Sequence, residues 1–218
     1  MRLAFLPPAA PILFALAAAL PVGAAAEGPY LKALGGASFL LDQTARRAGG
    51  GAAEASFDAG YGFGLAAGWE FTPNLAAEIE YLYRTGDAGS FAPGGFGAGG
   101  DLASVIVSGH LLYTLDGWEA PGGVGRLRPF GGVGVGIVQE VDFDISGGAA
   151  AGEYSDSGAI ALQARAGLRW DIDANWGLGL EARYLNAGSP TLKRSGGGES
   201  LKVRYETIDA FVSLSYRF

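Results

Sequence analysis

The sequence has no cysteine, one methionine and one histidine among its 218 residues. The absence of cysteine excludes a disulfide scaffold and a thiolate metal site. Charged residues make up only 17% of the chain and the formal net charge is −7, so it lacks the surplus of Lys and Arg with which nucleic-acid-binding proteins displace counterions. After residue 26 there is no run of about 18 consecutive apolar residues, which argues against a helical inner-membrane protein.

The first segment has the pattern of an export signal. Met1 and Arg2 provide a short positive start, residues 3–20 carry no charge, and small residues precede Glu27. This arrangement predicts a signal peptide, residues 1–26, whose removal leaves a mature domain of residues 27–218 outside the cytoplasm. Prolines interrupt the apolar run and argue against a membrane-spanning anchor. They are Pro7, Pro8, Pro11 and Pro21.

Glycine is abundant, with 38 residues, but it lies within regular apolar alternation and not in a disordered tract. Between Phe57 and Phe71 every odd position is apolar or aromatic, whereas the even positions are Gly, Ala, Asp or Glu. A period of two predicts a strand with two different faces. The same pattern predicts eight strands, at residues 30–41, 57–71, 75–84, 104–115, 132–137, 160–170, 176–184 and 208–218.

The connections between these strands alternate in length. We expect long loops at residues 42–56, 86–101, 142–157 and 187–199. The shorter connections are residues 72–74, 116–126 and 171–175. Long loops on one rim and short turns on the other are typical of an eight-stranded antiparallel up-and-down transmembrane barrel, whose strands of about 9–11 residues cross the bilayer with every backbone group paired.

A soluble barrel of the lipocalin type shows the same alternation with its apolar face inward, so the direction of the faces matters. The interior of an eight-stranded barrel is only just wide enough to be filled by side chains. Large apolar residues from every strand would overfill it, whereas glycines fit, so we expect the apolar face outward. Aromatic residues then form two membrane-interface belts. One comprises Tyr30, Trp69, Phe71, Tyr113, Trp170, Trp176, Tyr216 and Phe218, and the other comprises Phe39, Tyr61, Tyr83 and Tyr184.

Three segments carry a resemblance to a known family: residues 129–136 (PFGGVGVG), residues 175–184 (NWGLGLEARY) and residues 212–218 (VSLSYRF). With them the chain resembles the small outer-membrane beta-barrel family of Gram-negative bacteria, which includes opacity-type surface proteins and the membrane domain of OmpA. The resemblance covers essentially the whole mature chain and implies an outer-membrane location. The terminal strand ending at Phe218 looks like the signal read by the barrel-assembly machinery, so that machinery and the lipid bilayer are the implied partners.

Charged residues on the inward face of the predicted strands are nearly balanced in sign. The cations are Lys32, Arg84, Arg128, Arg165, Arg169, Arg183 and Arg217, and the anions are Glu70, Glu78, Glu80, Glu181 and Asp209. An ion-selective pore tends to line its wall with one sign. Mixed signs in a narrow lumen favour mutual pairing of charges that are too costly to bury alone, and we therefore expect a plug more than a channel.

Three further motifs have a weaker case. Asp142 to Glu153 has the spacing of an EF-hand calcium loop, but its flanks are strands and its second half is nearly all Gly and Ala, which favours an acidic surface loop. Residues 62–67 mimic a dinucleotide fingerprint, which would have to open a helix. Ser108 and His110 share a face, so a hydrolytic pair stays open, although a histidine hydrogen-bonded in the lumen is favoured.

These observations favour a non-enzymatic outer-membrane barrel with an envelope-structural role and exposed surface loops. The alternative is a passive, porin-like channel for small solutes. A barrel enzyme acting on lipid A and a soluble periplasmic binder are the remaining classes. We expect no catalytic, metal or cofactor site and no bound cofactor, and the sequence identifies no surface ligand.

Overall fold

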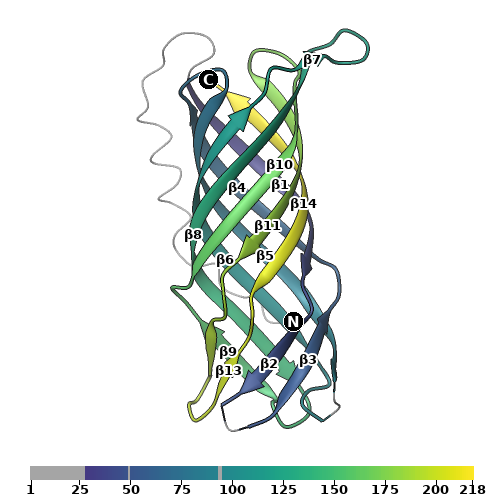
Figure 1. The fold of residues 1–218 in the computed structure, drawn as a ribbon, viewed down its shortest axis with the longest axis vertical. Helices are drawn as coiled ribbons and strands as arrows, with labels where there is room; N and C mark the ends of the chain where they lie inside the picture. The colour runs from purple at the N-terminus through teal and green to yellow at the C-terminus, as the bar shows by residue number, and fades with distance from the viewer. Residues whose placement is uncertain (1–27, 49, 93–94) are drawn as a thin grey trace.

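The computed structural model describes residues 28–48, 50–92 and 95–218, so the predicted signal peptide, residues 1–26, lies outside the described part. The described chain is a tall antiparallel β-barrel (Figure 1). Within these residues, no helix is long and apolar enough to cross a membrane. The strands are β1 (Gly28–Leu40), β2 (Gln43–Arg47), β3 (Ala52–Phe57), β4 (Gly60–Glu70), β5 (Leu75–Ala92), β6 (Gly99–Thr114), β7 (Trp118–Glu119), β8 (Arg126–Ser146), β9 (Gly152–Asp156), β10 (Ile160–Asp171), β11 (Trp176–Asn186), β12 (Thr191–Arg194), β13 (Ser200–Lys202) and β14 (Glu206–Arg217).

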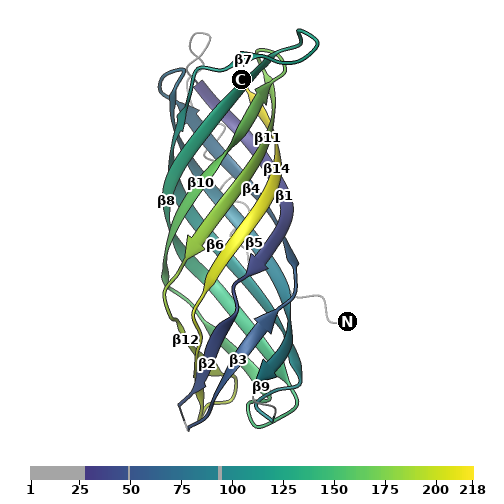
Figure 2. The ribbon, with the colours of Figure 1, turned by 45° about the vertical axis from the view of Figure 1, so that its right-hand side comes forward.

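The long strands pair in the order in which they occur in the chain. The antiparallel pairings are β1–β4, β4–β5, β5–β6, β6–β8, β8–β10, β10–β11, β11–β14 and β14–β1. Each of these strands overlaps one of the predicted strands, although predicted strand 57–71 begins earlier than β4 and includes Phe57, which belongs to β3. All eight are tilted relative to the long axis of the barrel (Figure 2). The sheet has fourteen strands, however, so the predicted strand count is correct only in part.

The additional strands correct the prediction of four long loops. At the end of the barrel opposite the short turns, β5, β3, β2, β13, β12, β9 and β8 are hydrogen-bonded in that order, and β6 pairs with both β5 and β8. We call this part, formed by β2, β3, β9, β12, β13 and the adjoining ends of β5, β6 and β8, the strand extension. These strands lie where the long loops were predicted. The backbone groups of the predicted loop residues form hydrogen bonds between neighbouring strands. At the opposite end, β7 pairs with β8 inside the predicted turn 116–126.

Between the strand extension and the short turns, the apolar face of the eight long strands points outward, as the packing argument predicts. Leu65, Leu111, Val133, Leu162 and Leu180 are each more than half exposed. A lipocalin-type barrel has its apolar face inward, so the observed direction contradicts that alternative. Inward glycines are also confirmed. A Cβ at Gly68 would overlap the Tyr30 ring, and one at Gly134 would overlap His110.

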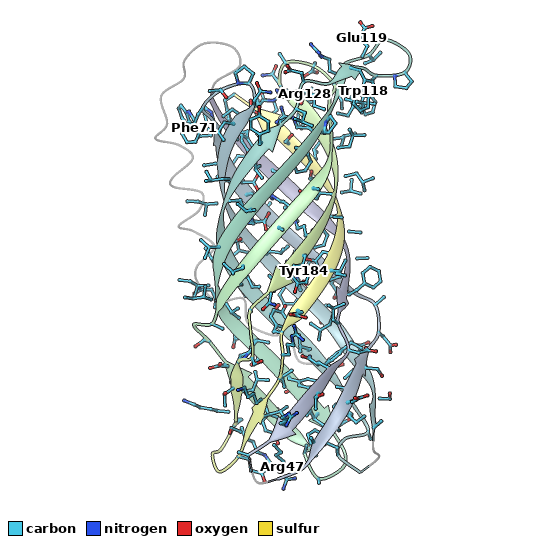
Figure 3. All side chains as sticks on the ribbon, in the orientation of Figure 1. Arg47, Phe71, Trp118, Glu119, Arg128 and Tyr184 are labelled. Atoms are coloured by element: carbon cyan, nitrogen blue, oxygen red, sulfur yellow. The ribbon has the colours of Figure 1, made fainter. Side chains whose placement is uncertain are left out.

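Two levels of outward aromatic residues are present, and Phe71 and Tyr184 mark them in Figure 3. Trp176 stacks edge-on against Tyr216, and Tyr216 against Phe218, with ring centroids 4.9 and 5.3 Å apart. Tyr30 is an exception to the predicted belt because it points inward and is only 6% exposed. It lies two residues from Lys32 and therefore shares the inward face of β1.

The strand extension reverses the polarity of the two faces. Its interior is apolar, and the largest buried side chains there include Phe143, Tyr154, Tyr205, Leu192 and Leu201. On β8, Val133, Val135 and Ile137 point outward, whereas Val141, Phe143 and Ile145 are buried inside. The pairing of β6 with β8 shifts here, because Val105 faces Glu140 whereas Ile106 faces Val138. The extra residue, Gln139, forms a β-bulge, which moves odd-numbered side chains from one face to the other.

Candidate functional site: the charged lumen

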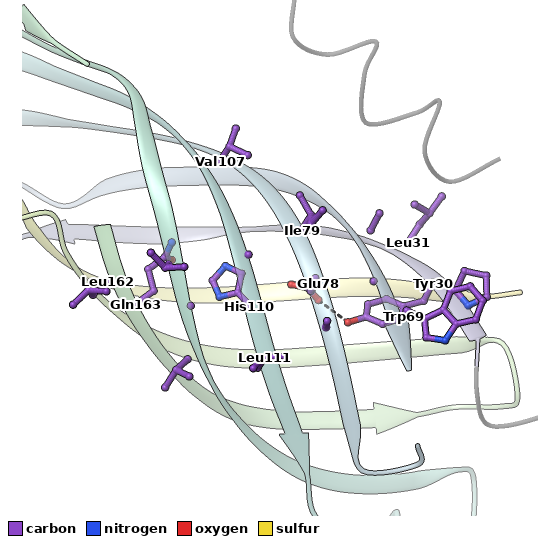
Figure 4. A pocket seen from close by; sticks show the side chains of 18 of the residues that line it. Tyr30, Leu31, Trp69, Glu78, Ile79, Val107, His110, Leu111, Leu162 and Gln163 are labelled. Carbon is purple, nitrogen blue, oxygen red and sulfur yellow. Dashed lines mark hydrogen bonds between the residues drawn. The ribbon is translucent and has the colours of Figure 1, made fainter. Parts of the chain in front are cut away.

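The centre of the lumen holds a buried ion-pair network built on two glutamates of β5. Glu78 accepts hydrogen bonds from Tyr30 Oη at 2.9 Å, Lys32 Nζ at 2.8 Å and Arg165 Nη2 at 2.7 Å. Figure 4 shows the bond between Tyr30 and Glu78 beside His110. Lys32, Glu78 and Arg165 are each less than a tenth exposed. The network therefore satisfies charges that would be costly to bury singly.

A second part of the network crosses the barrel. Arg183 Nη1 and Nη2 donate to the two carboxylate oxygens of Glu80 at 2.5 and 2.7 Å, and Arg183 Nη2 also lies 2.5 Å from Glu181 Oε1. Glu80 lies on β5 and Arg183 on β11, which are four strand pairings apart in either direction. The ion pair thus joins opposite walls. The guanidinium of Arg183 also lies 5.3 Å from the ring centre of Phe211.

Towards the strand extension, the lumen contains one more buried pair and then becomes apolar. Arg84 donates two hydrogen bonds to Asp209 Oδ2, from Nε at 3.0 Å and Nη2 at 2.8 Å, and Ser38 donates to Asp209 Oδ1 at 2.6 Å. Next to this pair, Leu34, Leu82 and Phe211 form a small buried cluster. Both guanidinium hydrogen bonds go to one carboxylate oxygen, and bonds between charged groups are stronger than those between neutral ones.

Towards the short turns, the charges of the lumen are less deeply buried. Arg169 pairs with Glu70 at 2.7 Å and with Asp171 at 2.9 Å, and Arg217 pairs with Asp171 at 2.5 Å. A cavity of about 40 Å³ lies between these residues and the central network. Asp171 is a lumen residue that the sequence interpretation missed, because it was assigned to the turn 171–175. The structure extends β10 through it.

The seven cations and five anions predicted to face the lumen lie there, and the predicted pairing of Glu78 or Glu80 with Arg165 or Arg183 is confirmed as contact. His110 is buried and its Nε2 lies 2.8 Å from Ser108 Oγ, as expected for a histidine in the polar network. Glu80 Oε1 approaches the same nitrogen at 3.8 Å. A hydrolytic triad needs the acid on the other ring nitrogen, so this trio lacks that geometry.

The structure also corrects the expected acidic loop from Asp142 to Glu153. Asp142 lies in β8 opposite Ser155 of β9, and Asp144 lies directly opposite Glu153, so the segment is a hairpin. Among the residues that the structure describes, no three His, Cys, Asp or Glu side chains are placed to hold a metal ion. The fingerprint-like residues 62–67 lie within β4, in agreement with the strand prediction.

Burial and the neighbouring carboxylates of Glu140, Asp144 and Glu153 raise the pKa of Asp142 to about 6. A carboxyl group whose pKa is raised on folding stabilises the fold below its unfolded pKa, and this stability is lost as the pH rises through the folded value. We expect Asp142→Asn to raise the free energy of unfolding by about 1 kcal/mol at pH 7.5, since the half-exposed group is screened by solvent. Below pH 4 we expect no gain.

Urea unfolding from lipid vesicles at both pH values measures this effect. Glu119→Gln, at the other end of the barrel, is the control because it makes the same change in net charge at an exposed site. An equal gain from Glu119→Gln, or a gain from Asp142→Asn that does not depend on pH, would contradict the assignment.

Comparison with known proteins identifies relatives of the same kind. An outer membrane protein of Gluconacetobacter diazotrophicus is 30% identical in an alignment of 203 residues that covers 79% of this chain and 50% of the relative. The chain therefore spans about half the length of that relative. Neisserial surface protein A has a similar structure, with a TM-score of 0.53 and 17% identity over 88% of this chain and 97% of that one. OprG from Pseudomonas aeruginosa has a TM-score of 0.54 and 11% identity over 89% of this chain and 99% of that one.

At such low identities, the two structural likenesses concern the fold alone. The family assignment comes from the sequence, because residues 10–218 match the outer membrane protein beta-barrel domain. The location follows from the family and from the relative. The chain is an outer-membrane protein of the Gram-negative type and belongs to the outer membrane protein beta-barrel domain family.

Proposed function

We propose that the eight long strands form a closed barrel that spans the outer membrane, with β14 and β1 sealing it. The continuous cycle of strand pairings supports closure, and the outward apolar belt supports the span. Strands β4 and β11 have 11 residues each, which suits a tilted transmembrane strand of about 9–11 residues. Residues 1–26 act as the signal peptide, and residues 27–218 form the mature domain.

The proposed role is structural and non-enzymatic. The barrel strengthens the envelope, its lumen acts as a plug, and the strand extension is presented at the cell surface. The observation that carries this proposal is the Glu80–Arg183 pair, which joins opposite walls of the lumen. The apolar interior of the strand extension, at one end of this lumen, also supports a plug. The position of Glu80 on the Ser108 side of His110 supports a non-catalytic histidine.

A passive channel for small solutes is the second candidate. The polar lumen and the cavity of about 40 Å³ near the short turns favour it. Conductance of refolded residues 27–218 in a planar bilayer separates the two functions. We expect no steady current for the plug, with a large porin as the positive control in the same bilayer. A steady, ohmic current from the wild-type chain would instead establish the channel.

The terminal residue provides a test of assembly. Phe218 is 57% exposed and ends the aromatic row of Trp176 and Tyr216. We expect Phe218→Ala, or deletion of Phe218, to lower the amount of inserted barrel because the terminal strand loses the residue that resembles the assembly signal. Immunoblots of outer-membrane fractions measure this amount, and Phe71→Ala serves as a control for loss of an exposed aromatic residue elsewhere. Unchanged levels for Phe218→Ala would refute the role.

A further inference from the structure

One side of the strand extension carries a row of carboxylates on adjacent strands. Asp87 of β5 faces Asp101 of β6, Asp101 faces Asp144 of β8, and Asp144 faces Glu153 of β9. All of these residues are exposed. Within the described part of the chain, no Lys, Arg or His nitrogen forms an ion pair with them. Like charges directly opposite each other destabilise a sheet, so this acidic row lacks a counter-charge.

Another side of the extension is basic. Arg46 of β2 lies directly opposite Lys202 of β13, and both are exposed. Lys193 of β12 and Arg204 point outward beside them. Arg204 pairs with Glu206 at 2.6 Å, whereas Arg46, Lys193 and Lys202 form no ion pair with the carboxylates that the structure describes. This basic face has the same unfavourable pairing of like charges as the acidic row.

The middle of the acidic row, on β6 and β8, lies nearly opposite the middle of the basic face, on β13, whereas the two faces adjoin at Glu153 of β9 and Lys193 of β12, which are neighbouring strands. The strands of the extension are hydrogen-bonded in the order β5, β3, β2, β13, β12, β9, β8, β6 and back to β5, so β13 is four pairings from β6 and three from β8.

We propose that the acidic row of one chain binds the basic face of a second copy, in a head-to-tail contact within the outer membrane. A membrane holds both copies upright and at the same depth, so the strand extensions of two neighbouring copies lie side by side. A second copy supplies the counter-charge for both faces at once, whereas a divalent cation or an anionic saccharide would relieve only one of them. A contact between two different faces of the same chain leads to rings or rows and not to a two-fold dimer.

Cross-linking of the full chain in the outer membrane of intact cells tests the contact. A carbodiimide joins a lysine amine directly to a touching carboxylate. The lysines of the sequence are Lys32, which is buried, and Lys193 and Lys202, which are exposed. We expect covalent dimers and higher oligomers from the wild-type chain. We expect about fivefold less product at high salt, because screening weakens contacts between exposed charges.

Charge reversal provides the decisive comparison. Arg46→Glu/Lys202→Glu places two carboxylates on the basic face but keeps the Lys193 amine, and Asp101→Lys/Asp144→Lys places two lysines in the acidic row. Each variant alone should give at least about fivefold less product than the wild type, because like charges then meet across the contact. Co-expression of the two variants with different tags should restore product that contains both tags. Protease resistance of each barrel confirms that it has folded.

Several results would overturn the proposal. One such result is a wild-type chain that stays monomeric after cross-linking. Another is co-expression of the two variants that gives no product containing both tags. Product that disappears when EDTA removes divalent cations, but does not change with charge reversal of the basic face, would assign the contact to cations between acidic rows. A basic face occupied by the phosphorylated saccharide of the outer leaflet would leave the wild type monomeric.

Discussion

Replacing Arg183 by Gln should lower the free energy of unfolding by about 3–5 kcal/mol, the largest effect that we expect from a lumen substitution. Arg183 is 2% exposed and neutralises Glu80 and Glu181, which are equally buried. Its loss leaves two carboxylates at the centre of the barrel with one cation fewer. Glu80→Gln should also destabilise the fold, because it removes the negative charge that Arg183 and Arg165 both contact.

The double variant Glu80→Gln/Arg183→Gln should cost less than the sum of the single changes, with a coupling energy of roughly 0.5–3 kcal/mol. Urea unfolding from lipid vesicles gives all four free energies of the cycle. The half-exposed pair Arg194–Glu199 of the extension is the control, and its cycle should give about 1 kcal/mol or less. Additive changes at Glu80 and Arg183 would show that the two charges do not share one network.

Leu180→Arg should destabilise the barrel by about 2–4 kcal/mol, the cost of a cation on the lipid face at mid-membrane. Leu180 is 60% exposed on the outer face of β11, in a row with Leu168 and Val212. Exposure of an apolar side chain is favourable only where lipid surrounds it. The arginine would have to enter hydrocarbon or reach a distant interface.

Val124→Arg is the matched control for this substitution. Val124 is 55% exposed in the turn between β7 and β8, outside the proposed span. It should change stability by less than about 0.5 kcal/mol, as surface substitutions usually do. Urea unfolding from vesicles applies to both variants. If Leu180→Arg proved as mild as Val124→Arg, the outer face of β11 would not face lipid.

The strand positions and the direction of the faces could be predicted because they depend on period-two alternation within single strands. The lumen charges could be predicted for the same reason, since Glu78, Glu80 and Arg84 alternate with apolar neighbours on β5. Which charge meets which could not be predicted. Those contacts depend on the register between strands, and Glu80 and Arg183 come together only through four successive pairings.

The strand extension could not be predicted for a different reason. Its apolar residues point inward, and those of the spanning part point outward, so one alternation rule cannot describe both. On β8 the odd positions from Val133 to Ile145 are apolar apart from Gln139, and only the bulge at Gln139 moves them to the other face. The acidic residues Asp142 and Asp144 favoured a solvated loop. They are instead the outward positions of a strand whose inward neighbour is Phe143.

The bulge in β8 has a consequence for how the chain tolerates changes in length. Insertion of one residue within a spanning strand would turn every later side chain of that strand to the wrong face, and the strand would place charges in lipid. At the boundary between the spanning part and the extension, one residue more or fewer is absorbed where the ladder is already interrupted. Insertions and deletions should therefore be selected against sharply along β4, β10 and β11, and most readily accepted near Gln139 and in the breaks at residues 58–59 and 157–159.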